Sequence, residues 1–287
     1  MTLASVPSPG SAIWRLGPLP VRAYAVCVAA AILLAIILAS YRYRRAGGRP
    51  GVILDVAAWA VPFGLIGAGL HALLIATRHD FRHHQQLWHD LTVSLAAVGV
   101  LGAIALGTAG AWIACRRAGV SLGPVAGAAA PAVLFGLAAG TLGHWWLQQY
   151  YGPPSGWWWA VRIPPTYRVP GYESYATFQP VFAYQSLWDV AAGFAVIWAA
   201  RRFALTGPRT FFLAAACYAV GSFAAESLLI GPMPHILGVP TGRFADLVVL
   251  AGALAGLYLT RREGAPPGRT YAKADLVDDS SGDVMSM

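Results

Sequence analysis

Few side chains in this sequence could carry chemistry, and they lie within or beside apolar segments. His144 can exchange a proton near neutral pH, because imidazole titrates in that range. Glu226 is an acidic residue in the middle of an apolar segment, where a carboxylate is costly unless a partner or a ligand holds it. These two residues are therefore candidates for proton transfer or for binding a polar group.

Both residues also have a purely structural interpretation. His144 precedes Trp145 and Trp146, and amphipathic rings of this kind gather at a membrane interface. A buried glutamate can hold helices together, and it tends to take up a proton when it lacks a charged partner. The sequence favours the interfacial interpretation of His144 and leaves both alternatives open for Glu226.

A histidine cluster precedes the third apolar segment. His79 and His83 are four residues apart and would share one face of a helix, and His with carboxylate ligands suits zinc. The cluster contains no closed zinc motif such as HExxH, so the sequence favours a solvated loop, with a metal site as the weaker alternative. We therefore expect no metal and no other cofactor.

The composition indicates that lipid is the solvent of this protein. The chain has 287 residues, of which 57% are hydrophobic and 11% are charged, whereas soluble domains carry roughly 25% charged residues. The formal net charge of +8 could suggest a nucleic-acid partner. Its arginines instead form short clusters between apolar runs, as in membrane proteins, so we expect no nucleic-acid partner.

Seven apolar runs reach or approach the roughly 20 residues that a membrane-spanning helix needs. They are Val21–Ser40, Val52–Thr77, Leu91–Ala114, Leu122–Trp146, Pro180–Ala200, Thr210–Ile230 and Phe244–Thr260. We therefore predict an all-α polytopic membrane protein with seven transmembrane helices. An extended extracytoplasmic loop, Tyr151–Gln179, should connect helices four and five.

The arginine clusters predict the orientation of the chain. They fall in alternate connections, such as the one that holds Arg44 and Arg49, and such connections are cytoplasmic. The N-terminus should then lie outside and the C-terminus in the cytoplasm. We divide the chain into an extracytoplasmic N-terminal segment (1–20), a seven-helix membrane domain (21–262) and a disordered cytoplasmic tail (263–287).

Several stretches resemble a known family. "LGPLPVRAY" (Leu16–Tyr24) and "RIPPTYRVPGYESYATFQPVFAYQSLWD" (Arg162–Asp189) are similar to the corresponding stretches of prolipoprotein diacylglyceryl transferases, especially actinobacterial ones. The family moves a diacylglyceryl group from phosphatidylglycerol to the thiol of a lipobox cysteine. The resemblance implies a seven-helix protein of the bacterial plasma membrane. Its implied partners are phosphatidylglycerol and the signal peptides of prolipoproteins.

The match is selective within the family's motifs. In "AAGTLGHWWLQQYYG" (138–152), the glycines of the most characteristic motif are kept, at Gly140, Gly143 and Gly152. The Arg, Asn, Asn and Glu positions of that motif hold Thr141, His144, Leu147 and Gln149. Other charged or His positions hold Gly69, Gln179, Gln185, Ser222 and Leu229. Residues that match the family at its tyrosine and glutamate positions are Tyr24, Tyr184 and Glu226.

These replacements remove most of the charges that the reaction needs, because a leaving phosphate calls for cations and a thiol for a base. We therefore expect a degenerate family member with weak or no standard activity. One alternative is an active transferase with a rebuilt site made of Tyr24, His144, Tyr184 and Glu226. Another is a lipid-binding or metal-responsive membrane protein. The amides of Gln149, Gln179 and Gln185, together with Tyr184, could hydrogen-bond a lipid headgroup.

Overall fold

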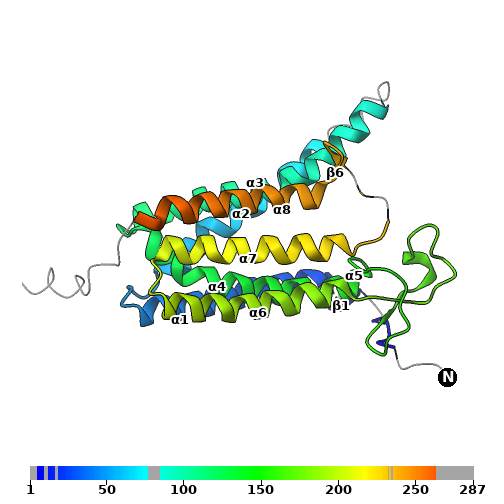
Figure 1. Ribbon diagram of the computed structural model, residues 1–287, viewed down its shortest axis with the longest axis horizontal. Coiled ribbons are helices and arrows are strands. Elements are labelled where there is room, and N and C mark those ends of the chain that lie inside the picture. The colour runs from blue at the N-terminus through cyan, green and yellow to red at the C-terminus, as the bar shows by residue number, and fades with distance from the viewer. Residues whose placement is uncertain are drawn as a thin grey trace, which may run out of the picture.

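The computed structural model is a bundle of long helices with an ordered loop region at one end (Figure 1). It describes residues 5–9, 12–16, 19–76, 85–231, 233 and 235–262, and side chains between 70 and 100 are not described. The helices are α1 (Ala23–Arg45), α2 (Val52–Ala76), α3 (Gln85–Arg117), α4 (Leu122–Thr141), α5 (His144–Leu147), α6 (Val181–Arg202), α7 (Gly207–Ser227) and α8 (Thr241–Leu259), with the short 3-10 helices η1 (Pro165–Tyr167) and η2 (Thr260–Arg262).

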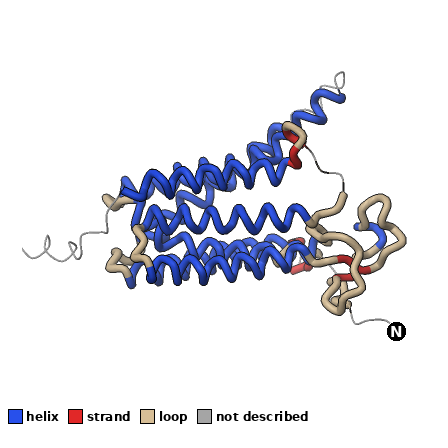
Figure 2. Tube along the Cα trace, in the orientation of Figure 1, coloured by secondary structure: helices blue, strands red, loops and turns tan. Residues whose placement is uncertain are grey.

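In the described part of the chain the strands are short and form three separate antiparallel pairs, shown in red in Figure 2. They are β1 (Ile13–Leu16) with β2 (Leu19–Arg22), β3 (Val161–Arg162) with β4 (Thr177–Phe178), and β5 (His235–Ile236) with β6 (Val239–Pro240). None of these pairs lies within a helical span. The prediction of a mostly helical membrane protein is confirmed.

Within the described residues, six helical segments are long and apolar enough to cross a membrane. They are Ala23–Arg45, Val52–Gly69, Leu122–Leu147, Val181–Arg202, Gly207–Ser227 and Thr241–Leu259. The predicted third span, Leu91–Ala114, lies within α3, whose side chains are described only from Leu101 onward. A seventh span therefore stays a prediction.

Proline marks where several helices begin. Pro180 and Pro240 precede the first residues of α6 and α8, and Pro208 lies in the first turn of α7. Proline is tolerated at a helix start because the first N–H groups of a helix have no partner within the helix. These residues explain why each of the three helices starts where it does.

Close helix packing in this bundle depends on small residues. Helix α2 packs along α3, and α1 packs along α4. A Cβ atom at Gly67 of α2 would overlap the backbone of Gly102 of α3. Contacts this close bring backbones together where lipid gives no hydrophobic drive for helix association.

The loop between α5 and α6 is an ordered structure with its own core. Tyr151, Val161, Ile163, Phe178 and Phe182 form a buried apolar cluster. The N-terminal segment joins it, because Val6 N–H donates to the Ala160 carbonyl at 2.9 Å. Figure 1 shows this loop beyond the bundle, at the end opposite the arginine-bearing end of α1. Which end faces the cytoplasm stays a prediction, as do the three domain boundaries.

Candidate functional site

A break in the predicted fourth helix places His144. The predicted span Leu122–Trp146 is divided into α4 and the four-residue α5. Gly143, at this break, lies so close to α1 that a Cβ there would be 2.9 Å from Tyr24 Cδ2 and 3.1 Å from Cys27 Cβ. As a result His144 packs edge-on against the Tyr24 ring, with ring centroids 5.5 Å apart. Its Nδ1 lies 3.0 Å from the Thr141 carbonyl oxygen.

The chain after α5 makes a tight left-handed turn. Gln148 and Tyr150 have φ values of 54° and 63°, in a backbone region that residues other than glycine rarely adopt. The turn brings the Tyr150 ring to 5.1 Å from the His144 ring, between centroids. Strained backbone persists only where the surroundings hold it, and it gathers at functional sites. This turn makes the end of the bundle near α5 a candidate site.

Three acidic side chains converge on this region from different helices: Asp189 of α6, Glu226 of α7 and Asp246 of α8. All three carboxyls are close enough to the Tyr150 hydroxyl to act on it electrostatically. Burial is the main cause that raises the pKa of Tyr150 well above that of an exposed phenol, and these carboxylates raise it further. Tyr150 therefore stays protonated and is available as a hydrogen-bond donor.

Asp189 and Asp246 are buried, and each has a carboxylate oxygen without a hydrogen-bond partner among the described residues. Asp189 is 0% exposed and Asp246 is 6% exposed. The Gln185 amide donates to Asp189 Oδ1 at 2.9 Å, and the Ser222 hydroxyl is hydrogen-bonded to Asp246. Among the described residues, the Oδ2 atom of each aspartate has no hydrogen-bond partner. Such atoms are costly in an apolar interior, which marks them as functional candidates.

Glu226 lies between α7 and the start of α8. Its carboxylate rests against Gly242, where a Cβ atom would overlap both of its oxygens. Arg243 follows on α8, and its Nη2 donates to the Glu226 backbone carbonyl at 3.4 Å. The guanidinium is close enough to attract the Glu226 carboxylate, whereas Asp246 repels it. Arg243 thus supplies a cation beside Glu226, although the positions expected to hold arginine contain Ser222 and Leu229.

The structure brings some of the predicted site residues together and leaves others in separate surroundings. The rings of Tyr24 and His144 are in direct contact, the Tyr150 ring also packs against His144, and Glu226 acts electrostatically on the Tyr150 hydroxyl. Gln185 is buried, and its amide nitrogen donates to Asp189, whereas its amide oxygen has no hydrogen-bond partner among the described residues, so its role in holding a headgroup stays a prediction. The remaining three headgroup candidates differ in their surroundings: the Tyr184 hydroxyl accepts a hydrogen bond from Trp159 Nε1 at 2.9 Å, Gln149 is exposed, and Gln179 is half-buried.

Four residues of the site were missed by the sequence prediction: Tyr150, Asp189, Arg243 and Asp246. A signal was present for two of them, since Asp189 and Asp246 lie inside the predicted apolar segments Pro180–Ala200 and Phe244–Thr260. An acidic residue within a predicted span is a functional candidate by default. Tyr150 and Arg243 lie outside the predicted segments, and only the fold shows that they meet the carboxyls.

The metal alternative concerns another part of the chain. His79 and His83 lie outside the described residues. Within the part of the chain that the structure describes, no three His, Cys, Asp or Glu side chains come close enough to hold a metal ion. The carboxyls of the candidate site are therefore not arranged as a metal centre.

An apolar helical bundle with polar groups buried at one end defines an integral membrane protein whose site lies among its helices. Residues 11–262 match the family model for prolipoprotein diacylglyceryl transferase. The chain belongs to this family.

Curated relatives agree with this assignment. The chain is 39% identical, over 91% of its length and 82% of the relative's, to phosphatidylglycerol–prolipoprotein diacylglyceryl transferase 2 of Streptomyces coelicolor. It is 40% identical to the Streptomyces avermitilis transferase, covering 94% of this chain and 78% of that one. It is 35% identical to the Mycobacteroides abscessus transferase, covering 98% and 87%.

Proposed function

We propose that this chain is a phospholipid-binding member of the family in which standard diacylglyceryl transfer is weak or absent. The observation that carries the proposal is a contrast between backbone and charge. Gly143 and Gly152 make the close contacts that only glycine allows. The neighbouring positions expected to hold charges contain Thr141 and Gln149. The framework of a transferase site is kept without its charges.

The local contacts support this proposal. The Thr141 hydroxyl donates to the Leu137 carbonyl within its own helix at 2.8 Å, so it is already engaged. A phosphate leaving group needs cations that hold its developing charge. The interior presents the carboxyl groups of Asp189, Glu226 and Asp246 instead, and carboxyl groups supply no positive charge to a leaving phosphate. These surroundings give little stabilisation to the departure of a phosphate ester.

The proposed setting is the bacterial plasma membrane, with the N-terminus outside and the C-terminus in the cytoplasm. The arginine-bearing ends of α1, α3 and α6 would then face the cytoplasm, as the positive-inside rule requires. The proposed ligand is phosphatidylglycerol, which the names of the relatives contain. Signal peptides of prolipoproteins are the proposed protein partners.

A specific set of contacts favours a second candidate, an active transferase with a rebuilt site. The rings of Tyr24 and Tyr150 both pack against His144, and Glu226 acts electrostatically on the Tyr150 hydroxyl. In that case His144 would be the base that activates the thiol and Arg243 would replace a lost cation. Tyr184 contributes less to this candidate, because its hydroxyl bonds Trp159 in the loop.

One assay separates the two candidates. The purified full-length chain and the Streptomyces coelicolor relative would each receive phosphatidylglycerol and a lipobox peptide, and mass spectrometry would detect the diacylglyceryl adduct. We expect a rate at least about 100-fold below that of the relative, because several charged groups are missing. A rate within tenfold of the relative would contradict the proposal.

Two variants and one binding measurement complete the assay. If turnover is seen and His144→Ala or Glu226→Ala abolishes it, the rebuilt site is supported. If turnover is absent, native mass spectrometry should still detect bound phosphatidylglycerol. Absence of both turnover and bound phosphatidylglycerol would refute a lipid-binding role.

A further inference from the structure

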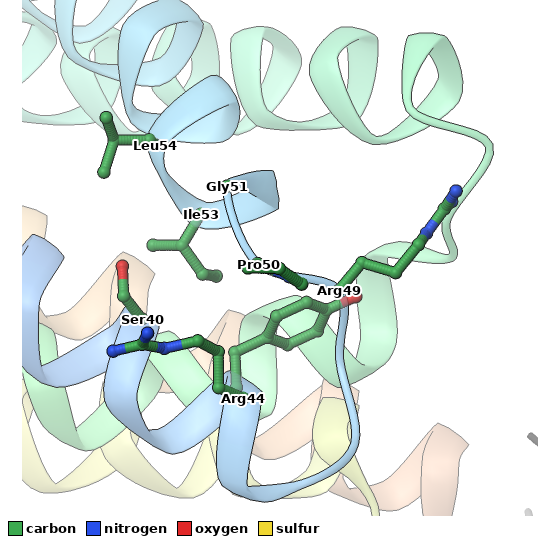
Figure 3. Close-up of a pocket in the computed structure, with 8 residues that line it drawn as sticks. Ser40, Arg44, Arg49, Pro50, Gly51, Ile53 and Leu54 are labelled. Carbon is green, nitrogen blue, oxygen red and sulfur yellow. The ribbon is translucent and has the colours of Figure 1, made fainter.

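A small pocket lies at the other end of the bundle, where α1 ends and a turn leads into α2. Its volume is about 200 Å³. The residues that matter here are Ser40, Arg44, Arg49, Ile53 and Leu54, drawn in Figure 3. This pocket shares no residue with the candidate site near His144.

The turn that forms the pocket is held in place by its own contacts. Gly48 N–H donates to the Tyr43 carbonyl at 3.0 Å, and a Cβ at Gly48 would overlap the Tyr43 ring. Gly47 and Gly51 have φ values of 86° and 89°, which favour glycine. Arg49 ties the turn to the connection after α3, since its Nη2 donates to the Ala118 carbonyl at 2.7 Å. The pocket is therefore preformed.

The donors of the pocket suit an anion. Arg49 is engaged with Ala118, whereas Arg44 is exposed and has no ion-pair partner within the described residues. Figure 3 shows the Arg44 guanidinium on the same side of the pocket as the Ser40 hydroxyl. A guanidinium presents a planar fork of donors that matches a phosphate group. Ile53 brings the first turn of α2 to the pocket wall, where free backbone N–H groups add positive potential.

The charges around the pocket also favour an anionic ligand. Arg42 and Arg201, from α1 and α6, are close enough to repel each other. The acidic residue in the first turn of α2, Asp55, is exposed and does not line the pocket. This end of the bundle therefore carries several arginines beside a preformed pocket that no acidic residue lines.

The pocket borders apolar surface that would face lipid. Leu54 is 62% exposed on the pocket rim, and Ile37, one turn before Ser40 on α1, is 63% exposed. Large exposed apolar side chains are normal where acyl chains surround a helix. We propose that this pocket binds the phosphate of an anionic phospholipid through Arg44 and Ser40, with the acyl chains along Leu54 and Ile37.

The test uses the purified full-length chain in detergent and native mass spectrometry. The probes are dioleoyl phosphatidic acid, dioleoyl phosphatidylcholine as a zwitterionic comparison, and inorganic phosphate as a competitor. Arg44→Gln should weaken phosphatidic acid binding roughly tenfold, because one charge-assisted contact is lost. The matched control is Arg45→Gln, which removes the same charge one residue away, where Arg45 lies 4.7 Å from the centre of the Tyr41 ring.

Binding by the Arg45→Gln variant should stay within about twofold of the unchanged protein, since Arg45 does not line the pocket. Equal losses in both variants would show a general surface-charge effect and overturn the proposal. Unchanged binding in both would also overturn it. If inorganic phosphate competes as well as the lipid headgroup and loses its effect only in Arg44→Gln, the pocket binds free phosphate and the lipid assignment is wrong.

Discussion

The carboxylate of Glu226 lies directly against Gly242, so that any side chain at that position of α8 would overlap both carboxylate oxygens. This contact joins α7 to α8 and fixes the carboxylate beside Arg243. The contacting atoms are the far end of a flexible, half-buried side chain, so an added methyl group at Gly242 would turn the Glu226 carboxylate aside. The observed place of the carboxylate therefore depends on the lack of a side chain at Gly242.

The first prediction concerns this contact. Gly242→Ala should displace the Glu226 carboxylate and destabilise the protein by about 1 kcal/mol or less, the low end of the usual cost of overpacking, because the flexible Glu226 side chain can turn aside. The measurement is thermal unfolding in detergent. Gly252→Ala on the same helix is the matched control, because a Cβ there meets nothing within 4 Å. The control should be neutral or slightly stabilising, since alanine favours helix more than glycine does. Equal effects of the two substitutions would contradict the contact.

The sequence predicts those parts of the fold that depend on a short stretch of chain, and it does not predict those that depend on contacts between distant residues. The apolar runs predict α1, α6, α7 and α8 to within a few residues, because a span needs a fixed length of apolar chain. They do not predict the break between α4 and α5. At that break Gly143 lies close to Tyr24 of α1, a tertiary contact that hydropathy does not contain.

The residues of the candidate site also divide into those that the sequence identifies and those that only the fold identifies. His144 and Glu226 are visible as unusual residues in the sequence, and Asp189 and Asp246 carry the same signal within predicted spans. Their common neighbour, Tyr150, is visible only once the left-handed turn brings it to the bundle. Some site residues can therefore be identified in the sequence as polar residues in apolar segments. The residues that lie between them are identified only from the tertiary structure.

The second prediction is a double-mutant cycle in the buried polar pair. Gln185 donates to Asp189 Oδ1 at 2.9 Å within α6. The variants Gln185→Ala, Asp189→Ala and the double variant should show a coupling of about 1 kcal/mol or more in unfolding free energy, because a buried hydrogen bond is worth that much. Additive effects would show that the pair contributes no specific interaction.

The third prediction is a pH dependence in the loop before α6. Glu173 accepts hydrogen bonds from Gly171 N–H at 3.0 Å. Hydrogen bonds from its own backbone N–H and from that of Gly171 hold the pKa of this exposed carboxyl below its ordinary value.

The direction of the effect follows from that lowered pKa. The stabilisation is present above the unfolded-state pKa and is lost as the pH falls through the lower folded-state pKa. Hydrogen exchange at the Gly171 amide should therefore become less protected in acid than exchange elsewhere in the loop. Glu173→Gln should remove this pH dependence; a variant that keeps it would show that another group is responsible.

The last prediction concerns the hydrogen bonds that close the same loop. The Tyr151 hydroxyl donates to the Tyr167 carbonyl at 2.6 Å and accepts from Val169 N–H at 3.0 Å. Tyr151→Phe keeps the ring, which packs 4.9 Å from the Phe178 ring between centroids, and leaves both backbone groups without this partner. We expect a loss of about 1–3 kcal/mol in the free energy of loop opening, measured by hydrogen exchange at Val169.

Tyr175→Phe is the control for this substitution, because Tyr175 is an exposed tyrosine of the same loop. Its effect should stay within about 0.5 kcal/mol, as is usual for a surface position. Burial raises the pKa of Tyr151, so its neutral form is favoured in the folded loop; the stabilisation is fully present below the unfolded-state pKa and is lost as the pH rises through the higher folded-state pKa. Tyr151→Phe should therefore also abolish an alkaline loosening of the loop. If both substitutions loosen the loop equally, the two hydrogen bonds of Tyr151 do not hold it closed.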